Sequence, residues 1–265
     1  MLIAGGLAAA IVAIVVLGGA ALILGKPSVS SSPLLPASAA AAASPAPSGA
    51  GPSIGRTASA TAGGPLAAAL VKALHANPFL GHVVVTTVAR DALKATLERE
   101  TATASGDVSG TDVDLHVTDV GGSNPAVDQE VVLVGDTAWI RPKGGSWTAH
   151  PRADVASSID GLRSTIALID DPTQLVDLGV ETIDGRQLHH LSAPKGVTYR
   201  SASGEGAYDS LDIWVTDAGL PVIAKGSFTA MYASTPVVGN VDIRYSDIGK
   251  AVTIRPPEGA PSSSG

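Results

Sequence analysis

The spacing of apolar residues predicts two amphipathic helices. In residues 65–76, a leucine recurs at every fourth position, namely at Leu66, Leu70 and Leu74. Pro65 suits the first turn of this helix, and Asn77-Pro78 should end it. In residues 154–170 the apolar positions are three or four apart, at Ile159, Leu162, Ile166 and Ile169. Each helix should therefore present one apolar stripe to a core.

From residue 81 onward the period becomes two, which is typical of strands with one dry face and one wet face. In residues 112–117, for example, three polar residues alternate with Val113, Leu115 and Val117. Asp184-Gly185 is typical of a type I′ hairpin turn. Further strands are expected at 208–216, 220–230, 237–245 and 251–255. No segment shows the regular alternation of strands and helices that builds a parallel sheet. The order of the expected elements therefore predicts an α+β fold with helices on one face of an antiparallel sheet.

An apolar run precedes these elements. Residues 2–25 carry no charged side chain, and the first charge is Lys26. The run is long enough to cross a bilayer as one helix, which needs about 20 residues, whereas the apolar core of a secretory signal has about 7–15. We therefore predict that residues 1–26 are a transmembrane anchor.

The remaining zones follow from composition. In residues 27–64, 33 of 38 positions are Pro, Ser, Ala, Gly or Thr, which predicts a disordered linker. Residues 65–255 should form one globular domain, and residues 256–265 a disordered tail. Lys26 favours a cytoplasmic position for the end of the helix that carries it, whereas the Ser/Thr/Pro-rich stalk is typical of an extracellular spacer. We expect a single-pass plasma-membrane protein with its domain outside the cytoplasm.

Charge and cysteine content exclude several functions. The globular zone holds 23 acidic and 15 basic residues, a formal charge of −8, and has no adjacent pair of basic residues. Binding to nucleic acid is therefore not expected, because the phosphates require a basic footprint. The chain has no cysteine, which excludes disulfides, thiol catalysis and thiolate metal sites.

No motif for catalysis or for a cofactor stands out. His189 and His190 are neighbours on an expected strand and should point to opposite faces, so they cannot chelate one ion. The Gly-x-Ser-x-Gly motif, the EF-hand spacing and a phosphate-binding glycine loop are absent from the sequence. We therefore expect a protein that is not an enzyme and that holds no metal or cofactor.

Three segments resemble one known family. Residues 175–191 read LVDLGVETIDGRQLHHL, residues 211–223 read LDIWVTDAGLPVI, and residues 241–254 read VDIRYSDIGKAVTI. Their order and spacing resemble the actinobacterial LppX/LprG-type lipoproteins, which are similar in fold to LolA and LolB. The resemblance covers about residues 66–256. It departs from the family pattern at Ala251, where proline is frequent, and in lacking the lipidated cysteine, which the apolar N-terminal run would replace.

The resemblance implies a curved antiparallel half-barrel with helices on its concave face. Characterised members of the family carry acylated lipids or lipoglycans in an apolar cavity. By strand and helix alternation, such a cavity would be lined here by Val113, Leu115, Val117, Ile159, Leu162, Ile166, Ile213 and Val215.

Two hypotheses about function remain open from the sequence. The first is a membrane-anchored protein that binds or hands off lipid or lipoglycan acyl chains in a cavity of this kind. The second is a non-enzymatic cell-envelope interaction or sensor module, with a filled half-barrel and a protein partner on its acidic outer face. The interior volume distinguishes them, because a ligand cavity should measure about 300–1,000 Å³.

Overall fold

The computed structural model describes residues 61–62, 64–76, 78–91, 100–121, 126–201, 204–232 and 235–261. The predicted anchor (1–26) and nearly all of the predicted linker (27–64) lie outside these ranges. Within them, no helix is both long and apolar enough to cross a membrane.

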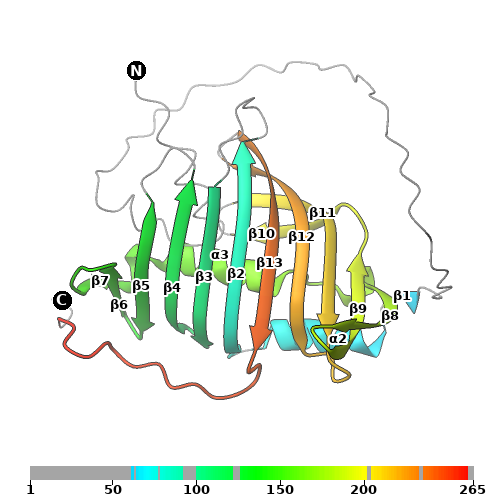
Figure 1. Cartoon of the computed structure of the whole chain (residues 1–265), viewed down its shortest axis with the longest axis horizontal. Helices are drawn as coiled ribbons and strands as arrows, with labels where there is room; N and C mark the ends of the chain where they lie inside the picture. The colour runs from blue at the N-terminus through cyan, green and yellow to red at the C-terminus, as the bar shows by residue number, and fades with distance from the viewer. Residues whose placement is uncertain are drawn as a thin grey trace.

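The described residues form one large antiparallel sheet (Figure 1). Its strands follow the order β1-β8-β9-β11-β12-β13-β2-β3-β4-β5-β6-β7, and β10 pairs with β11 beside this path. The strands are β1 (Thr61–Ala62), β2 (Leu80–Asp91), β3 (Glu100–Ser109), β4 (Asp112–Gly121), β5 (Val127–Val134), β6 (Thr137–Pro142), β7 (Thr148–Pro151), β8 (Val176–Ile183), β9 (Arg186–Ala193), β10 (Val197–Ser201), β11 (Gly204–Val215), β12 (Pro221–Tyr232) and β13 (Thr235–Ser246).

The sheet consists of two runs of strands joined at its centre. β2 to β7 follow one another as a meander, and β8 to β13 form the other half. The halves meet where β13 pairs with β2, in a register that places Ile243 opposite Val85. The first long strand of the domain and the last therefore lie side by side in the middle of the sheet.

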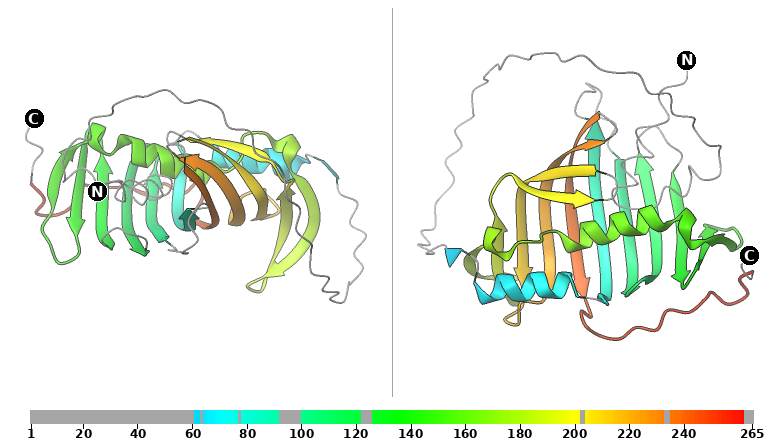
Figure 2. Two further views of the ribbon diagram at one scale, coloured as in Figure 1. Left: turned by 90° about the horizontal axis from the view of Figure 1, so that it is seen from above. Right: turned by 180° about the vertical axis from the view of Figure 1, so that it is seen from behind.

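Within the described ranges, two α-helices cover one face of this sheet. They are α2 (Pro65–Leu74) and α3 (Ala156–Ala167), and short 3-10 turns occur at η1 (Arg152–Asp154) and η2 (Pro172–Gln174). Figure 2 shows both helices lying across the same face, with β10 folded over that face next to α3. The predicted α+β class and the grouping of helices on one face of an antiparallel sheet are confirmed.

The core lies between the helices and the sheet. In β4, Val113, Leu115 and Val117 are buried, while the residues between them face the other, more polar side of the sheet. They join one hydrophobic cluster with Leu70 of α2 and Ile159 of α3. The period of two in the strands and the apolar stripes of the helices therefore meet at a single interface, as the pattern predicts.

The predicted turn at residues 184–185 is confirmed, whereas one predicted strand is wrong. Asp184 and Gly185 have φ angles of 51° and 75°, as a type I′ turn requires at both central positions. The strand expected at 251–255 is wrong, because β13 is already paired with β12 on one side and β2 on the other. Instead, the segment runs along the end of the sheet without forming a strand, as far as Pro261, whose carbonyl oxygen accepts a 2.9 Å hydrogen bond from Trp139 Nε1.

Candidate functional site

The eight residues predicted to line a lipid cavity are all core residues. None has more than 3% of its surface exposed, and all eight belong to the cluster that packs the helices onto the sheet. The structure does bring them together on the helix-covered face. Ile166 alone among the eight lines a depression described below.

This depression is a cleft at the end of the helix pair, with a volume of about 480 Å³. Its lining residues come from the ends of α2 and α3, the residue before β2, the end of β3 and the turn between β3 and β4. Its lining residues are Leu74, His75, Ala76, Phe79, Val108, Gly110, Thr111, Arg163, Ser164, Ile166, Ala167, Leu168 and Asp170. The cleft thus combines apolar and polar side chains, and polar groups contribute at least as much of its lining as apolar groups.

The chain leaves α3 at the cleft through an unusual backbone conformation at Leu168. Leu168, immediately after the helix, has a φ of 54° and a ψ of −55°, and the Ile169 N–H donates to the Ala167 carbonyl oxygen over 2.5 Å. This is the geometry of a γ-turn with positive φ, which is rare and strained for a residue with a side chain. The turn directs the buried Leu168 side chain into the wall of the cleft.

Two hydrogen bonds fix the position of the end of α3. Tyr245 of β13 donates from its hydroxyl to the Ile166 carbonyl oxygen, over 2.9 Å. His75, just after α2, lies 3.0 Å from the Ile169 carbonyl oxygen through Nε2, which donates in the tautomer that protonates it. The same Nε2 is 3.3 Å from the exposed Asp170 carboxylate at the rim. The cleft is therefore bounded by elements that are tied to one another.

One arginine, Arg163, lines the cleft. Its Nε and Nη2 atoms are buried without a hydrogen-bond partner among the described residues. Burial lowers the pKa of the guanidinium, and the nearby charge of Arg152 lowers it further. Arg152 itself donates to the carbonyl oxygens of Gly135 and Thr111 over 2.8 and 2.9 Å. Arg163 thus lacks the partners that its neighbour has.

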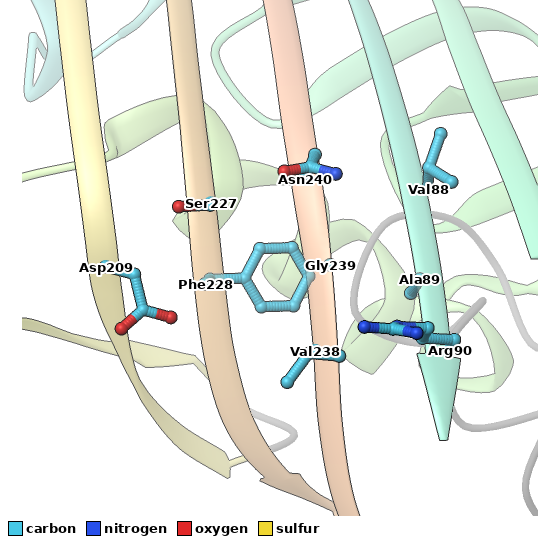
Figure 3. A pocket seen from close by; sticks show the side chains of 9 residues that line it. All are labelled: Val88, Ala89, Arg90, Asp209, Ser227, Phe228, Val238, Gly239 and Asn240. Atoms are coloured by element: carbon cyan, nitrogen blue, oxygen red, sulfur yellow. The ribbon is translucent and has the colours of Figure 1, made fainter. Parts of the chain in front are cut away.

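Depressions also occur on the other face of the sheet. One of about 490 Å³ lies over β4–β6, but its charged groups pair with one another, as in the Lys143–Asp128 contact of 2.6 Å. A groove of about 210 Å³ crosses β2 and β11–β13 (Figure 3). Figure 3 shows the Arg90 and Asp209 side chains on opposite sides of this groove and the ring of Phe228 against Gly239.

A buried polar group on the helix-covered face was not anticipated from the sequence. Glu100 and Asp119 lie on the neighbouring strands β3 and β4, are almost fully buried and hydrogen-bond to each other. Burial and the Asp119 charge raise the pKa of Glu100 to about 8. Burial also raises the pKa of Asp119. The sequence does carry one signal of this burial. Asp119 follows Val113, Leu115 and Val117 at a spacing of two, which places it on the same buried face of β4.

The adjacent histidines do point to opposite faces, as predicted. His190 stacks on Trp214 with ring centroids 4.6 Å apart, and it contacts Glu181 and Asp212 over 3.1 and 2.9 Å. His189 instead lies 3.3 Å from Asp217. The two rings therefore belong to separate environments.

Comparison with known proteins places few constraints on this chain. No family model matches it, and neither does any curated protein. Among solved structures it is similar to a LolA superfamily protein from Nitrosomonas europaea, with 14% identity, 71% of this chain and 93% of the other covered, and a TM-score of 0.23.

Two further solved structures are similar to this chain, again with low sequence identity and a low TM-score. A DUF1329 family protein from Desulfovibrio piger shares 13% identity, with 69% and 89% of the two chains covered and a TM-score of 0.22. An outer membrane lipoprotein-sorting protein domain from Vibrio parahaemolyticus shares 10%, with 71% and 92% covered and a TM-score of 0.23. At such TM-scores the likenesses carry no argument, so the architecture rests on the coordinates and membership of the LppX/LprG-type family stays a prediction.

Proposed function

We propose that the protein binds a lipid or another amphiphile by inserting its apolar part into the cleft between α2, α3 and the adjoining ends of β2 and β3. The observation that carries this proposal is the cleft volume of about 480 Å³, which lies within the range of about 300–1,000 Å³ for small-molecule sites. Anchoring through residues 2–25 would hold the domain at the outer surface of a membrane, where a local hand-off of lipid is feasible.

Binding in the cleft would be non-covalent. Leu74, Val108 and Leu168 are buried behind the cleft, and the apolar surface open to a ligand comes from Ala76, Phe79 and Ala167. Each Å² of apolar surface that a ligand removes from water contributes about 25 cal/mol. Because the wall is tied by the hydrogen bonds of Tyr245 and His75, little ordering of the protein would oppose binding.

A second candidate is a cell-envelope interaction module. It is favoured by the packing of the helix-covered face, where seven of the eight residues expected to line a cavity do not line the cleft. In that function the acidic outer surface would contact a protein partner and the cleft would have no ligand.

A matched pair of tryptophan substitutions separates the two candidates. Ala76 lines the cleft at the end of α2 and is exposed, whereas Ala68 is exposed on α2 and does not line the cleft. We expect Ala76→Trp to weaken binding of a fluorescent long-chain fatty acid to the full-length protein at least tenfold, and Ala68→Trp to leave it unchanged. Absence of fatty-acid binding to the unsubstituted protein, together with no lipid in native mass spectra of protein extracted gently from its host, would favour the interaction module.

A further inference from the structure

We infer that Arg163 recognises the oxyanion of a single-chain amphiphile, a carboxylate or phosphate, whose apolar chain occupies the cleft. This inference rests on the proposed function and adds the chemistry of the ligand head group. It starts from the contacts that Arg163 lacks. The two guanidinium atoms Nε and Nη2 are buried and have no partner among the described residues, although each carries hydrogen-bond donors.

Such an arrangement is unfavourable in the free protein. A buried donor without an acceptor destabilises the protein, and the effect is larger when the group is charged. Asp160 and Asp112 lie near enough to stabilise the charge of Arg163 electrostatically, but neither accepts a hydrogen bond from it within the described part of the chain. A ligand that supplied acceptors would remove this cost on binding, so the site favours an acceptor over a donor.

The chemistry of the side chain selects the kind of acceptor. The guanidinium presents its donors as a planar fork, which matches the two oxygens of a carboxylate or phosphate. A rotation of the long Arg163 side chain would turn the Nε and Nη2 edge into the cleft that it lines. Asp170, the carboxylate that lines the cleft, is exposed beside His75.

The apolar and polar parts of the cleft are arranged for one amphiphile. Phe79 and Ala167 are half-buried and line the same cleft as Arg163, so an acyl chain could pack on them while its head group meets the guanidinium. Neither part alone explains the cleft. A purely apolar ligand would leave the Arg163 donors unpaired, and a free anion would leave the apolar wall in contact with water.

Calorimetric titration of the full-length protein tests this inference. The ligands are dodecanoate, its uncharged analogue dodecanamide and inorganic phosphate, each below any micellar concentration. We expect dodecanoate to bind at least tenfold more tightly than dodecanamide, and phosphate alone to bind more weakly than dodecanoate. In Arg163→Gln the two C12 ligands should bind about equally. Arg163→Lys should recover only part of the preference, because lysine keeps the charge but not the fork.

Arg186→Gln is the matched control, since Arg186 is exposed on β9 and does not line the cleft. It should keep the preference of the unsubstituted protein. Equal binding of dodecanoate and dodecanamide to the unsubstituted protein would overturn the role of Arg163 and leave the proposed function standing. Loss of both ligands in a folded Arg163→Gln variant would also overturn it, as would phosphate binding as tight as dodecanoate binding. If neither C12 ligand binds the unsubstituted protein, the proposed function itself fails.

Discussion

The hydroxyl of Tyr245 donates a hydrogen bond of 2.9 Å to the carbonyl oxygen of Ile166, and this contact joins β13 to the last turn of α3. The last carbonyl groups of a helix have no partner within the helix, so a donor from the sheet satisfies one of them. Burial raises the pKa of the Tyr245 hydroxyl well above its usual value, which keeps it protonated as a donor. The wall of the cleft therefore depends on a side chain far from α3 in the sequence.

The first prediction concerns this contact. Tyr245→Phe removes the donor and leaves the Ile166 carbonyl buried without it. We expect the free energy of unfolding to fall by about 1–3 kcal/mol, measured by urea denaturation. Fatty-acid binding should weaken as well, because the end of α3 loses its fixed position. A variant as stable as the unsubstituted protein would show that water or another donor replaces the hydroxyl without cost.

The second prediction concerns pH. The ordinary pKa of a glutamate side chain is 4.5, and in the folded protein the pKa of Glu100 is raised to about 8. The causes are burial, the Asp119 charge and the hydrogen bond to Asp119. Between these values the folded state holds a proton that the unfolded chain has released, so rising pH favours unfolding. The stabilisation is complete below about pH 4.5 and is lost as the pH rises towards 8. The raised pKa of Asp119 acts in the same direction.

We therefore expect the free energy of unfolding to fall between pH 5 and pH 8, by an amount on the order of a few kcal/mol. Glu100→Gln cannot ionise and should flatten this dependence, whereas Glu258→Gln, at an exposed position, should not. Denaturation in urea over a series of pH values measures the effect. If the free energy of unfolding of Glu100→Gln fell equally steeply with pH, the pH dependence would come from other groups.

The third prediction concerns a close approach in the centre of the sheet. A Cβ atom at Gly239 would lie 2.7 Å from the Phe228 ring and 2.7 Å from the Val88 carbonyl oxygen. Gly239→Ala should destabilise the protein by about 1–3 kcal/mol through overpacking. Gly64→Ala, where a Cβ would meet nothing within 4 Å, is the control and should change little. Similar thermal midpoints for the two variants would contradict the packing at Gly239.

The fourth prediction separates the core from the cleft. Leu162 is buried against the sheet and does not line the cleft. Leu162→Trp should therefore lower the free energy of unfolding by about 1–3 kcal/mol, while the folded fraction binds fatty acid with unchanged affinity. Blocked binding in a folded Leu162→Trp protein would place the ligand in the core rather than in the cleft.

The sequence predicts those elements whose signal is local. The alternation at 112–117, the leucine stripe of α2 and the Asp184-Gly185 turn each specify their structure within a few residues, and each is found in the coordinates. The 3-10 turn η1 and the short strands β1 and β10 carry weaker local patterns and are not predicted by the sequence.

The candidate site could be predicted only in part. Alternation identifies which residues face inwards, but it does not reveal whether inward side chains fill the space, because that depends on how α3 crosses the sheet. Arg163 lies between Leu162 and Ser164 without any distinguishing pattern, and its lack of partners becomes evident only when α2, α3 and the β3–β4 turn are brought together. The Glu100–Asp119 contact likewise depends on the register of β3 with β4.

The pairing of β13 with β2 has a consequence for how the protein is made. During synthesis, β2 emerges early and exposes one edge until β13, near the end of the domain, leaves the ribosome. Contacts between such distant segments close large loops and slow folding. A chain that is truncated before β13 would keep this edge open, and an unpaired edge is prone to join strands of other molecules. Completion of the domain therefore closes the edge of β2 that faces β13 in the finished sheet.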